Sequence, residues 1–323
     1  NYFSTDVPKA IPDLGSAMIL LGLFLSLGLG LGLAWMLENL NTKVRTVDDL
    51  ARATQLPMLA VIPKLDEASP GAISALTRQL KDGADSSSSA TENPFTNFSA
   101  AEAYRMLRTS VLLSTADHPP RTILVTSGEP GDGKTTTIIN TAVTLTQLKA
   151  KVLLIDCDMR KPRVHRLAGI ENSEGLSSYL SNGGEVSDFI KPTGIPNLFI
   201  LPSGRIPPNP SELISSLTMK TMLQRLTEEY DYVLIDSPPV ATVTDPIILS
   251  TLVEGVILVA KSGKTKSEVL RRITHDLLSR RAKVLGVVLN NLDVRRNGYG
   301  YEYYYYDYKH HYSDKEDKRE VAA

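Results

Sequence analysis

The sequence predicts an α/β protein built on a doubly wound, mainly parallel sheet with helices on both faces. From about residue 100, short aliphatic and β-branched runs alternate with helical segments, which is typical of such a sheet. We expect a transmembrane helix before this core and a disordered, tyrosine-rich tail after it. The predicted strands are Thr122–Thr126, Val152–Ile155, Leu198–Leu201, Tyr232–Ile235, Val256–Ala260 and Val284–Leu289.

The whole-chain composition excludes several classes of protein. A length of 323 residues allows one large α/β domain plus accessory segments. The formal net charge of -1 gives no electrostatic case for nucleic-acid binding. The single cysteine, Cys157, excludes an internal disulfide and suits a reducing compartment. Because the chain begins at Asn1 rather than at a methionine, we expect it to be part of a longer protein.

An apolar segment covers residues 14–37 and contains no charged side chain. It is long enough, as a helix, to cross the hydrocarbon layer, so we predict a transmembrane helix. Residues 1–13, which contain proline, would then be periplasmic. Lys43, Arg45 and Arg52 follow the span whereas one basic residue precedes it, which favours a cytoplasmic C-terminal side.

Within this span, Gly28 and Gly32 form a G-x-x-x-G pair. Such a pair allows two helices to approach closely. The alternative interpretation is that glycine is simply common in transmembrane helices.

Residues 38–99 are predicted to form a juxtamembrane unit followed by a flexible linker. Thr46 is suited to cap a short helix that ends before Pro57. The later part of the segment loses apolar residues and includes four consecutive serines. We expect the folded domain to cover residues 100–297 and the tail to cover 298–323, where aliphatic residues are too few to join a core.

A phosphate-binding loop lies between the first predicted strand of this domain and a helix. Its sequence GEPGDGKT matches G-x-x-x-x-G-K-T in the strand–loop–helix context that the motif requires. Lys134 is suited to neutralise the β- and γ-phosphates of ATP, and the hydroxyl of Thr135 to ligate Mg²⁺. The sequence therefore predicts a P-loop NTPase fold. The expected nucleotide-binding residues of the loop are Gly128, Gly131, Asp132, Gly133, Lys134, Thr135 and Thr136.

Three aspartates follow two further predicted strands: Asp156 and Asp158 after one, and Asp236 after the other. Because ligands of open α/β sheets bind at the carboxyl ends of the strands, we expect these side chains beside the phosphate loop. Alternation along the chain points Asp156 and Asp158 to the same side. We predict that Thr135, Asp158 and Asp236 hold the metal, although aspartates after strands also commonly form turns and helix caps.

A cluster of tyrosines occupies the C-terminal tail, where charged residues flank it and keep it soluble. Beside a phosphate-transfer site we interpret these tyrosines as phosphate acceptors. The alternative is a low-complexity segment that stacks on partners without modification. The candidate acceptors are Tyr299, Tyr301, Tyr303, Tyr304, Tyr305, Tyr306, Tyr308 and Tyr312.

Taken together, these motifs resemble the bacterial tyrosine autokinases of the Wzc-type polysaccharide co-polymerases. The D-x-D-x-R pattern ending at Arg160 is similar to the additional acidic box of that family. Pro202–Ile214 resembles the family's loop after the third strand, and the proline-containing start resembles its segment before the membrane. Partitioning ATPases of related sequence usually carry a signature lysine where this chain has Glu129.

A further resemblance concerns the motif E-x-x-R-x-x-R at Glu102, Arg105 and Arg108. It is similar to the subunit-contact motif of the same family, and the spacing of three places the side chains on one helical face. The alternative is a solvated charged face.

The resemblance implies a kinase that uses ATP and Mg²⁺ to phosphorylate tail tyrosines on a neighbouring subunit of a homo-oligomeric ring. It implies catalytic roles for Lys134, Asp156, Asp158 and Asp236. It also implies a cognate tyrosine phosphatase and polysaccharide export machinery as partners, and regulation of capsule or exopolysaccharide polymerisation. The bacterial inner membrane, with the kinase domain in the cytoplasm, would be its location.

A tyrosine hydroxyl has an ordinary pKa near 10, so a carboxylate within hydrogen-bond reach helps as proton acceptor. We predict that Asp158 is this base, with Asp156 as the alternative. Asn290 is predicted to bind the edge of the adenine, or to be a turn residue. Two other functions stay open, a membrane-associated positioning ATPase and a nucleotide-stabilised export scaffold without kinase activity.

Overall fold

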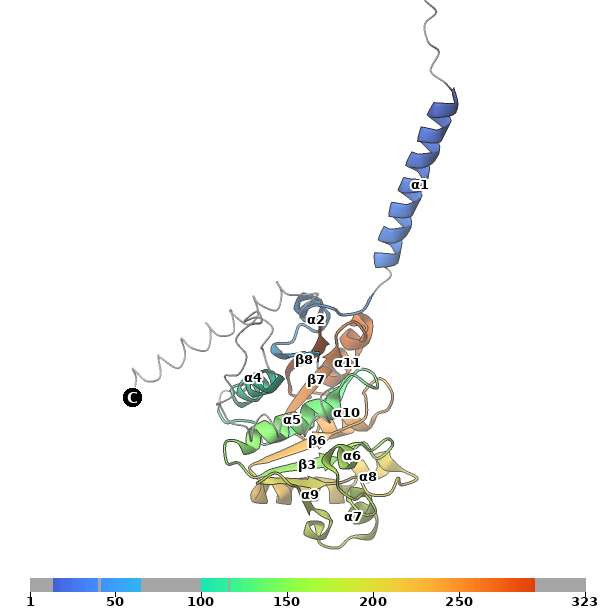
Figure 1. The fold of residues 1–323 in the computed structure, drawn as a ribbon. Coiled ribbons are helices and arrows are strands. Elements are labelled where there is room, and N and C mark those ends of the chain that lie inside the picture. The colour runs from blue at the N-terminus through green and yellow to red at the C-terminus, as the bar shows by residue number, and fades with distance from the viewer. Residues whose placement is uncertain (1–13, 40–41, 65–99, 116, 294–323) are drawn as a thin grey trace, which may run out of the picture. The chain divides into compact units, whose positions relative to one another are not determined.

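The structure, a computed structural model, describes residues 14–39, 42–64, 100–115 and 117–293 (Figure 1). The chain divides into two compact units, with the boundary between Thr42 and Lys43. The predicted periplasmic segment, the linker from residue 65 onward and the tail tyrosines lie outside the described residues.

The first unit contains one long helix, α1, which covers Leu14–Asn39. A helix was predicted over residues 14–37, and it is present. The large apolar side chains from Met18 to Leu33 are exposed by more than half of their surface. In the part of the chain that the structure describes, however, no helix has both the length and the apolar content that a membrane crossing needs. The predicted crossing therefore stays a prediction.

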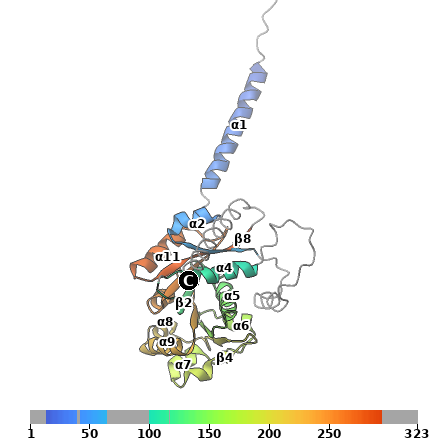
Figure 2. The ribbon, with the colours of Figure 1, turned by 90° about the vertical axis from the view of Figure 1, so that its left-hand side faces the viewer.

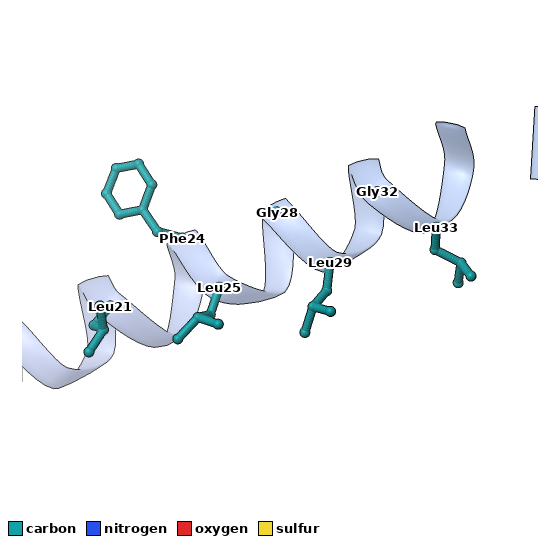
Figure 3. Close-up of a pocket in the computed structure, with 7 residues that line it drawn as sticks. All are labelled: Leu21, Phe24, Leu25, Gly28, Leu29, Gly32 and Leu33. Carbon is teal, nitrogen blue, oxygen red and sulfur yellow. The ribbon is translucent and has the colours of Figure 1, made fainter. Parts of the chain in front are cut away.

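One side of α1 carries a shallow groove that passes over Gly28 and Gly32 (Figure 3). A Cβ atom built on either glycine meets no other atom within 4 Å. The helix surface is thus open at the G-x-x-x-G pair, and the predicted helix pairing stays a prediction. The residues that line the groove are Leu21, Phe24, Leu25, Gly28, Leu29, Gly32 and Leu33.

The second unit is built on an eight-stranded sheet with the order β1-β8-β7-β2-β6-β3-β5-β4. Neighbouring strands are parallel except for the antiparallel β4–β5 pair. The six predicted strands are all present, which confirms the mainly parallel α/β sheet. The bounds are β1 Met58–Pro63, β2 Thr122–Ser127, β3 Val152–Asp156, β4 Lys191–Pro192, β5 Leu198–Leu201, β6 Tyr232–Asp236, β7 Gly255–Lys261 and β8 Val284–Leu292.

Helices cover both faces of this sheet, because the strands are apolar on both faces. Ile123 and Val125 of β2 belong to the apolar cluster that contains α4 and α5, whereas Leu124 between them belongs to the cluster that contains α9. Figure 2 shows β2 between α5 and α11. The bounds are α2 Val47–Thr54, α4 Ala100–Leu112, α5 Lys134–Thr146, α6 Val164–Ala168, α7 Leu176–Asn182, α8 Pro210–Ile214, α9 Leu217–Glu229, α10 Asp245–Ser250 and α11 Ser267–Ser279, with a 3-10 turn at Val186–Phe189.

The sheet begins earlier in the chain than the sequence indicated. The predicted cap at Thr46 is confirmed, since its hydroxyl accepts from Asp49 N at 3.2 Å and Asp49 Oδ2 accepts from Thr46 N at 3.1 Å. After α2, however, the chain adds β1 to the edge of the sheet, parallel to β8. The folded unit therefore starts at Lys43 rather than near residue 100. The strand was missed because it is short and lies beside a long polar segment.

The contribution of β1 leads to a prediction about two fragments. A fragment starting at Lys43 is expected to fold, whereas one starting at Ala100 loses β1 and exposes the edge of β8. Four consecutive residues of β1 are buried, and burial of a large apolar side chain contributes about 1.5–3 kcal/mol. We expect the shorter fragment to be less stable by at least about 3 kcal/mol on this basis. Urea unfolding followed by circular dichroism measures the difference, and equal unfolding midpoints would refute it.

Candidate active site

The phosphate loop connects β2 to α5 and takes a conformation that glycine makes possible. Gly131 and Gly133 have φ values of 80° and 101°, in the left-handed region that other residues rarely adopt. A Cβ atom at Gly133 would also lie only 1.9 Å from Asn290 Nδ2. Glycine at position 133 is therefore required twice, by the backbone and by the close approach of Asn290.

The loop is held from inside by Asp132, whose side chain is fully buried. Its Oδ2 accepts a hydrogen bond from Glu129 N at 3.0 Å, and its Oδ1 lies 3.2 Å from Lys264 Nζ. Asn290 Nδ2 donates to the Asp132 carbonyl at 2.8 Å. The side chains of Asp132 and Asn290 thus shape the loop here, while the predicted contact of Asn290 with adenine stays a prediction.

Lys134, the first residue of α5, meets two of the predicted aspartates. Its Nζ lies 3.1 Å from Asp158 Oδ2 and 3.5 Å from Asp236 Oδ1. It also donates to Thr135 Oγ1 at 3.2 Å, and that hydroxyl donates to Asp236 Oδ2 at 2.7 Å. Three chain segments, the start of α5, the end of β6 and the loop after β3, thereby converge where the sequence predicted.

Burial sets the electrostatics of this cluster. Lys134 is 8% exposed and Asp236 is fully buried. Burial alone lowers the pKa of the Lys134 ammonium, but the charges of Asp236 and Asp158 together raise it above its usual value. Burial raises the pKa of the Asp236 carboxyl, against the opposing effect of Lys134 and Thr135. The ammonium therefore remains charged and offsets part of the negative charge of the two acids.

Asp156 occupies a different place from Asp158. Its Oδ1 accepts from Asp158 N at 3.1 Å, and its Oδ2 accepts from the backbone of Arg163 and Val164 at 3.2 and 3.1 Å. Burial, followed by the charge of Asp236, raises the pKa of Asp156 to about 8. Asp156 thus fixes the loop that carries Asp158, while Asp158 faces Lys134. The geometry favours Asp158 over Asp156 as the proton acceptor.

The donor set fits Mg²⁺ as a partner of bound phosphate rather than as a resident ion. Among the described residues, no group of three or more His, Cys, Asp or Glu side chains could hold a metal by itself. Mg²⁺ is usually bound by one or two carboxylates together with waters and substrate phosphates. Thr135, Asp158 and Asp236 supply such oxygens, and among the described residues the only partner of the buried Asp236 Oδ1 is the ammonium of Lys134 at 3.5 Å.

Two supporting interactions near the site were not predicted from the sequence. Arg160 contacts buried Asp245 at the start of α10 with distances of 2.9 Å from Nε and 3.3 Å from a terminal nitrogen, and it donates to Ser211 Oγ at 2.9 Å. Lys264 reaches the phosphate loop from the turn after β7. Their partners lie far away in sequence, so the pairs become visible in the fold alone.

The remaining predicted residues are placed as follows. Thr136 is half-buried in α5. In α4, Glu102 and Arg105 form an ion pair at 2.5 Å with both side chains about half exposed. Arg108 donates to the Thr144 carbonyl of α5 at 2.8 Å. The three residues share one helix as predicted, and their contact with another subunit stays a prediction.

Comparison with known proteins places this site in a family. A family model described as an AAA domain matches residues 120–281, half of the chain. Tyrosine-protein kinase YwqD of Bacillus subtilis (strain 168) is 38% identical over 202 residues, which is 62% of this chain and 85% of that protein. Putative tyrosine-protein kinase CapB of Staphylococcus aureus is 37% identical over 201 residues, 62% of this chain and 88% of that protein.

Solved structures agree with these relatives. The chimerical protein CapA2B2 is 34% identical with a TM-score of 0.66, covering 77% of this chain and all of that one. The kinase domain of the Escherichia coli tyrosine kinase ETK is 28% identical with a TM-score of 0.64, covering 76% of this chain and 92% of that one. By its P-loop fold, its AAA domain and its relatives, this chain belongs to the bacterial tyrosine-protein kinases.

Proposed function

We propose that this kinase transfers the γ-phosphoryl group of ATP to tyrosines in the C-terminal tail of a neighbouring copy in a homo-oligomeric ring. The observation that carries the proposal is the placement of Asp158 Oδ2 3.1 Å from Lys134 Nζ, at the mouth of the phosphate loop. The proposed base, Asp158, therefore lies next to Lys134, the cation that is expected to neutralise the phosphates. The tail supplies eight tyrosines between residues 299 and 312 as acceptors.

Binding of the triphosphate relies on the phosphate loop and the start of α5. Backbone N–H groups of the loop and the positive end of the helix attract the phosphate oxygens. Lys134 shifts its interaction from the acids toward the β- and γ-phosphates, which are more strongly charged than either carboxylate. Mg²⁺, when bound at Thr135, Asp158 and Asp236, supplies further neutralisation of the phosphate charge.

The transfer step moves one proton and one phosphoryl group. The tyrosine oxygen forms a bond to the γ-phosphorus as the bond from that phosphorus to the bridging oxygen breaks, and ADP leaves. The proton of the tyrosine hydroxyl passes to Asp158. Asp156 contributes by holding the loop that carries Asp158 rather than by touching the substrate. Positioning and charge neutralisation therefore supply most of the catalysis.

Phosphorylation of the tail also offers a means of control. Each phosphate adds about -1.5 to -2 charges at pH 7, so a multiply phosphorylated tail repels its neighbours and loosens the ring. The resemblance to the Wzc-type polysaccharide co-polymerases supports a role beside capsule or exopolysaccharide polymerisation and export, and the tyrosine-protein kinase wzc of Salmonella typhimurium is 36% identical over 200 residues. A tyrosine phosphatase would reverse the modification.

The first experiment maps phosphosites after incubation with Mg²⁺ and ATP. In the parent chain, we expect phosphate on tyrosines 299–312, and in Lys134→Met none, because the variant lacks the cation that neutralises the phosphates. Mass spectrometry supplies the readout.

A mixture of Lys134→Met with an active chain that lacks residues 298–323 tests transfer between copies, since the tail of the inactive variant can then be phosphorylated only by the active chain. If the chain produces ADP but its tail stays unmodified, it is an ATPase instead of a kinase. If the oligomer has the same size before and after phosphorylation, the loosening of the ring is refuted.

The second experiment separates binding from chemistry at Asp158. We expect Asp158→Asn to bind ADP within about threefold of the parent but to lose phosphotyrosine formation by a factor of at least 10², the usual range for a general base. Asp188→Asn is the matched control, because Asp188 is exposed and distant in sequence from the site residues. Full autophosphorylation by Asp158→Asn would remove Asp158 from the mechanism.

We also propose that α1 attaches the kinase to the bacterial inner membrane, with the folded unit in the cytoplasm. The exposed apolar side chains between Met18 and Leu33 support this placement, because an apolar surface of this kind associates with lipid or protein rather than with water. The whole chain is expected to float with vesicles of phosphatidylethanolamine and phosphatidylglycerol in a density gradient. A fragment starting at Lys43 should remain at the bottom, and equal flotation of both would contradict the proposal.

A further inference from the structure

We propose that Lys264 is a positioning residue of the phosphate loop, which holds the loop ready for nucleotide through Pro130 and Asp132 without touching the nucleotide itself. The inference deepens the proposed function, because it rests on nucleotide binding at this loop.

The ammonium of Lys264 contacts the phosphate loop at two places. Its Nζ donates to the Pro130 carbonyl and lies 3.2 Å from Asp132 Oδ1. A Cβ atom built on Gly131, between these two residues, would lie 3.2 Å from the same nitrogen. The ammonium therefore sits against the backbone at the bend of the loop, and its side chain keeps 39% of its surface exposed.

Asp132 makes this contact important. Its side chain has no solvent exposure, and burial raises the pKa of its carboxyl while Lys264 opposes the shift. A buried carboxylate that loses its cation is strongly destabilised, much more than the pair contributes when intact. Because Asp132 Oδ2 also accepts from Glu129 N, a movement of Asp132 would carry the start of the loop with it.

The backbone around Lys264 is fixed on both sides, so the ammonium is directed toward the loop. Gly263 N donates to the Val44 carbonyl at 2.8 Å, and Val44 N donates to the Thr265 carbonyl at 2.9 Å. The turn is closed by Thr265 Oγ1, which accepts from Lys261 N at 2.8 Å. Val44 is fully buried. A residue anchored in this way acts as a fixed support rather than as a mobile surface lysine.

Nucleotide binding needs such a support because the loop conformation is unfavourable by itself. It contains two glycines with positive φ. In a phosphate-binding loop the backbone N–H groups also point toward the anion site, and they repel each other until an anion binds. A loop that is already held in this conformation binds phosphate without the cost of ordering it. Without Lys264, we expect Asp132 to move toward water and the loop to lose this arrangement.

The test measures Mg²⁺-ADP affinity of the whole chain by calorimetry, together with hydrogen exchange of the peptide that contains the loop. Lys264→Met keeps the length of the side chain and removes its charge, whereas Lys264→Arg keeps the charge. Lys266→Met is the matched control, since Lys266 is an exposed lysine two residues further along the chain, at the N-cap of α11. The double variant Lys264→Met with Asp132→Asn removes both charges of the pair.

We expect Lys264→Met to weaken ADP binding at least about tenfold and to speed hydrogen exchange in the loop, because the buried carboxylate of Asp132 loses its cation. Lys266→Met should stay within about twofold of the parent by comparison with exposed charges generally. Lys264→Arg should recover part of the affinity. The double variant should bind better than Lys264→Met alone, because no unpaired buried carboxylate remains. At saturating ATP, turnover of Lys264→Met should approach that of the parent.

If Lys264→Met binds Mg²⁺-ADP with the affinity of the parent and its loop peptide exchanges hydrogen at the parent's rate, the inference is overturned. A double variant as weak as Lys264→Met would overturn it as well, since Lys264 would then act on the phosphates directly. These measurements do not depend on tyrosine phosphorylation. A chain that binds ADP normally but never modifies its tail would refute the proposed function alone, whereas a parent that binds no ADP would refute both.

Discussion

The buried ammonium of Lys134 between Asp158 and Asp236 is the interaction on which the rest of the site depends. Two carboxylates that are almost completely buried cannot remain ionised side by side without a cation. The same cation is the group that a nucleotide phosphate needs. The protein therefore keeps Lys134 and the two acids in an arrangement in which one positive charge offsets part of their negative charge, and phosphate and Mg²⁺ can exchange into it. The sheet makes this possible because β3 and β6 are neighbours in the centre and end at the same edge.

Around that cluster, each residue that is proposed to act on the nucleotide or on the tyrosine is held in position by another residue that takes no part in the reaction. Asp156 accepts three backbone N–H groups and fixes the loop of Asp158. Asp132, Lys264 and Asn290 support the phosphate loop between β2 and α5. Arg160 ties the loop after β3 to Asp245 in α10. Such support is what allows phosphoryl transfer, which depends on position and charge, to proceed on loops rather than on rigid strands.

Most of this fold is predictable from the sequence because the signals are local. The six central strands are continuous apolar runs, and the phosphate loop is a contiguous motif between a strand and a helix. Thr46 was recognisable as a helix cap because both halves of a capping box lie within four residues. The strand β1 was missed because its partner β8 is more than 200 residues away, and a six-residue apolar run beside a polar segment carries no mark of its pairing. Asp132 and Asn290 were predicted as nucleotide-binding residues, whereas their contacts with each other and with Lys264 are long-range and appear in the fold alone.

The sequence by itself determined the class of chemistry, because a phosphate loop, acids at the ends of strands and a tyrosine-rich tail can be recognised from few positions and a fixed spacing. Tertiary structure decided which of the neighbouring acids faces the cation. Asp156 and Asp158 are two residues apart, and alternation alone makes them equivalent. They differ because the chain turns directly after β3 and folds its own N–H groups onto Asp156, leaving Asp158 to face Lys134. The proposed role of Lys264 has the same origin. Its sequence position marks it only as a lysine in a turn, and the fold brings the buried carboxylate of Asp132 within 3.2 Å of its ammonium.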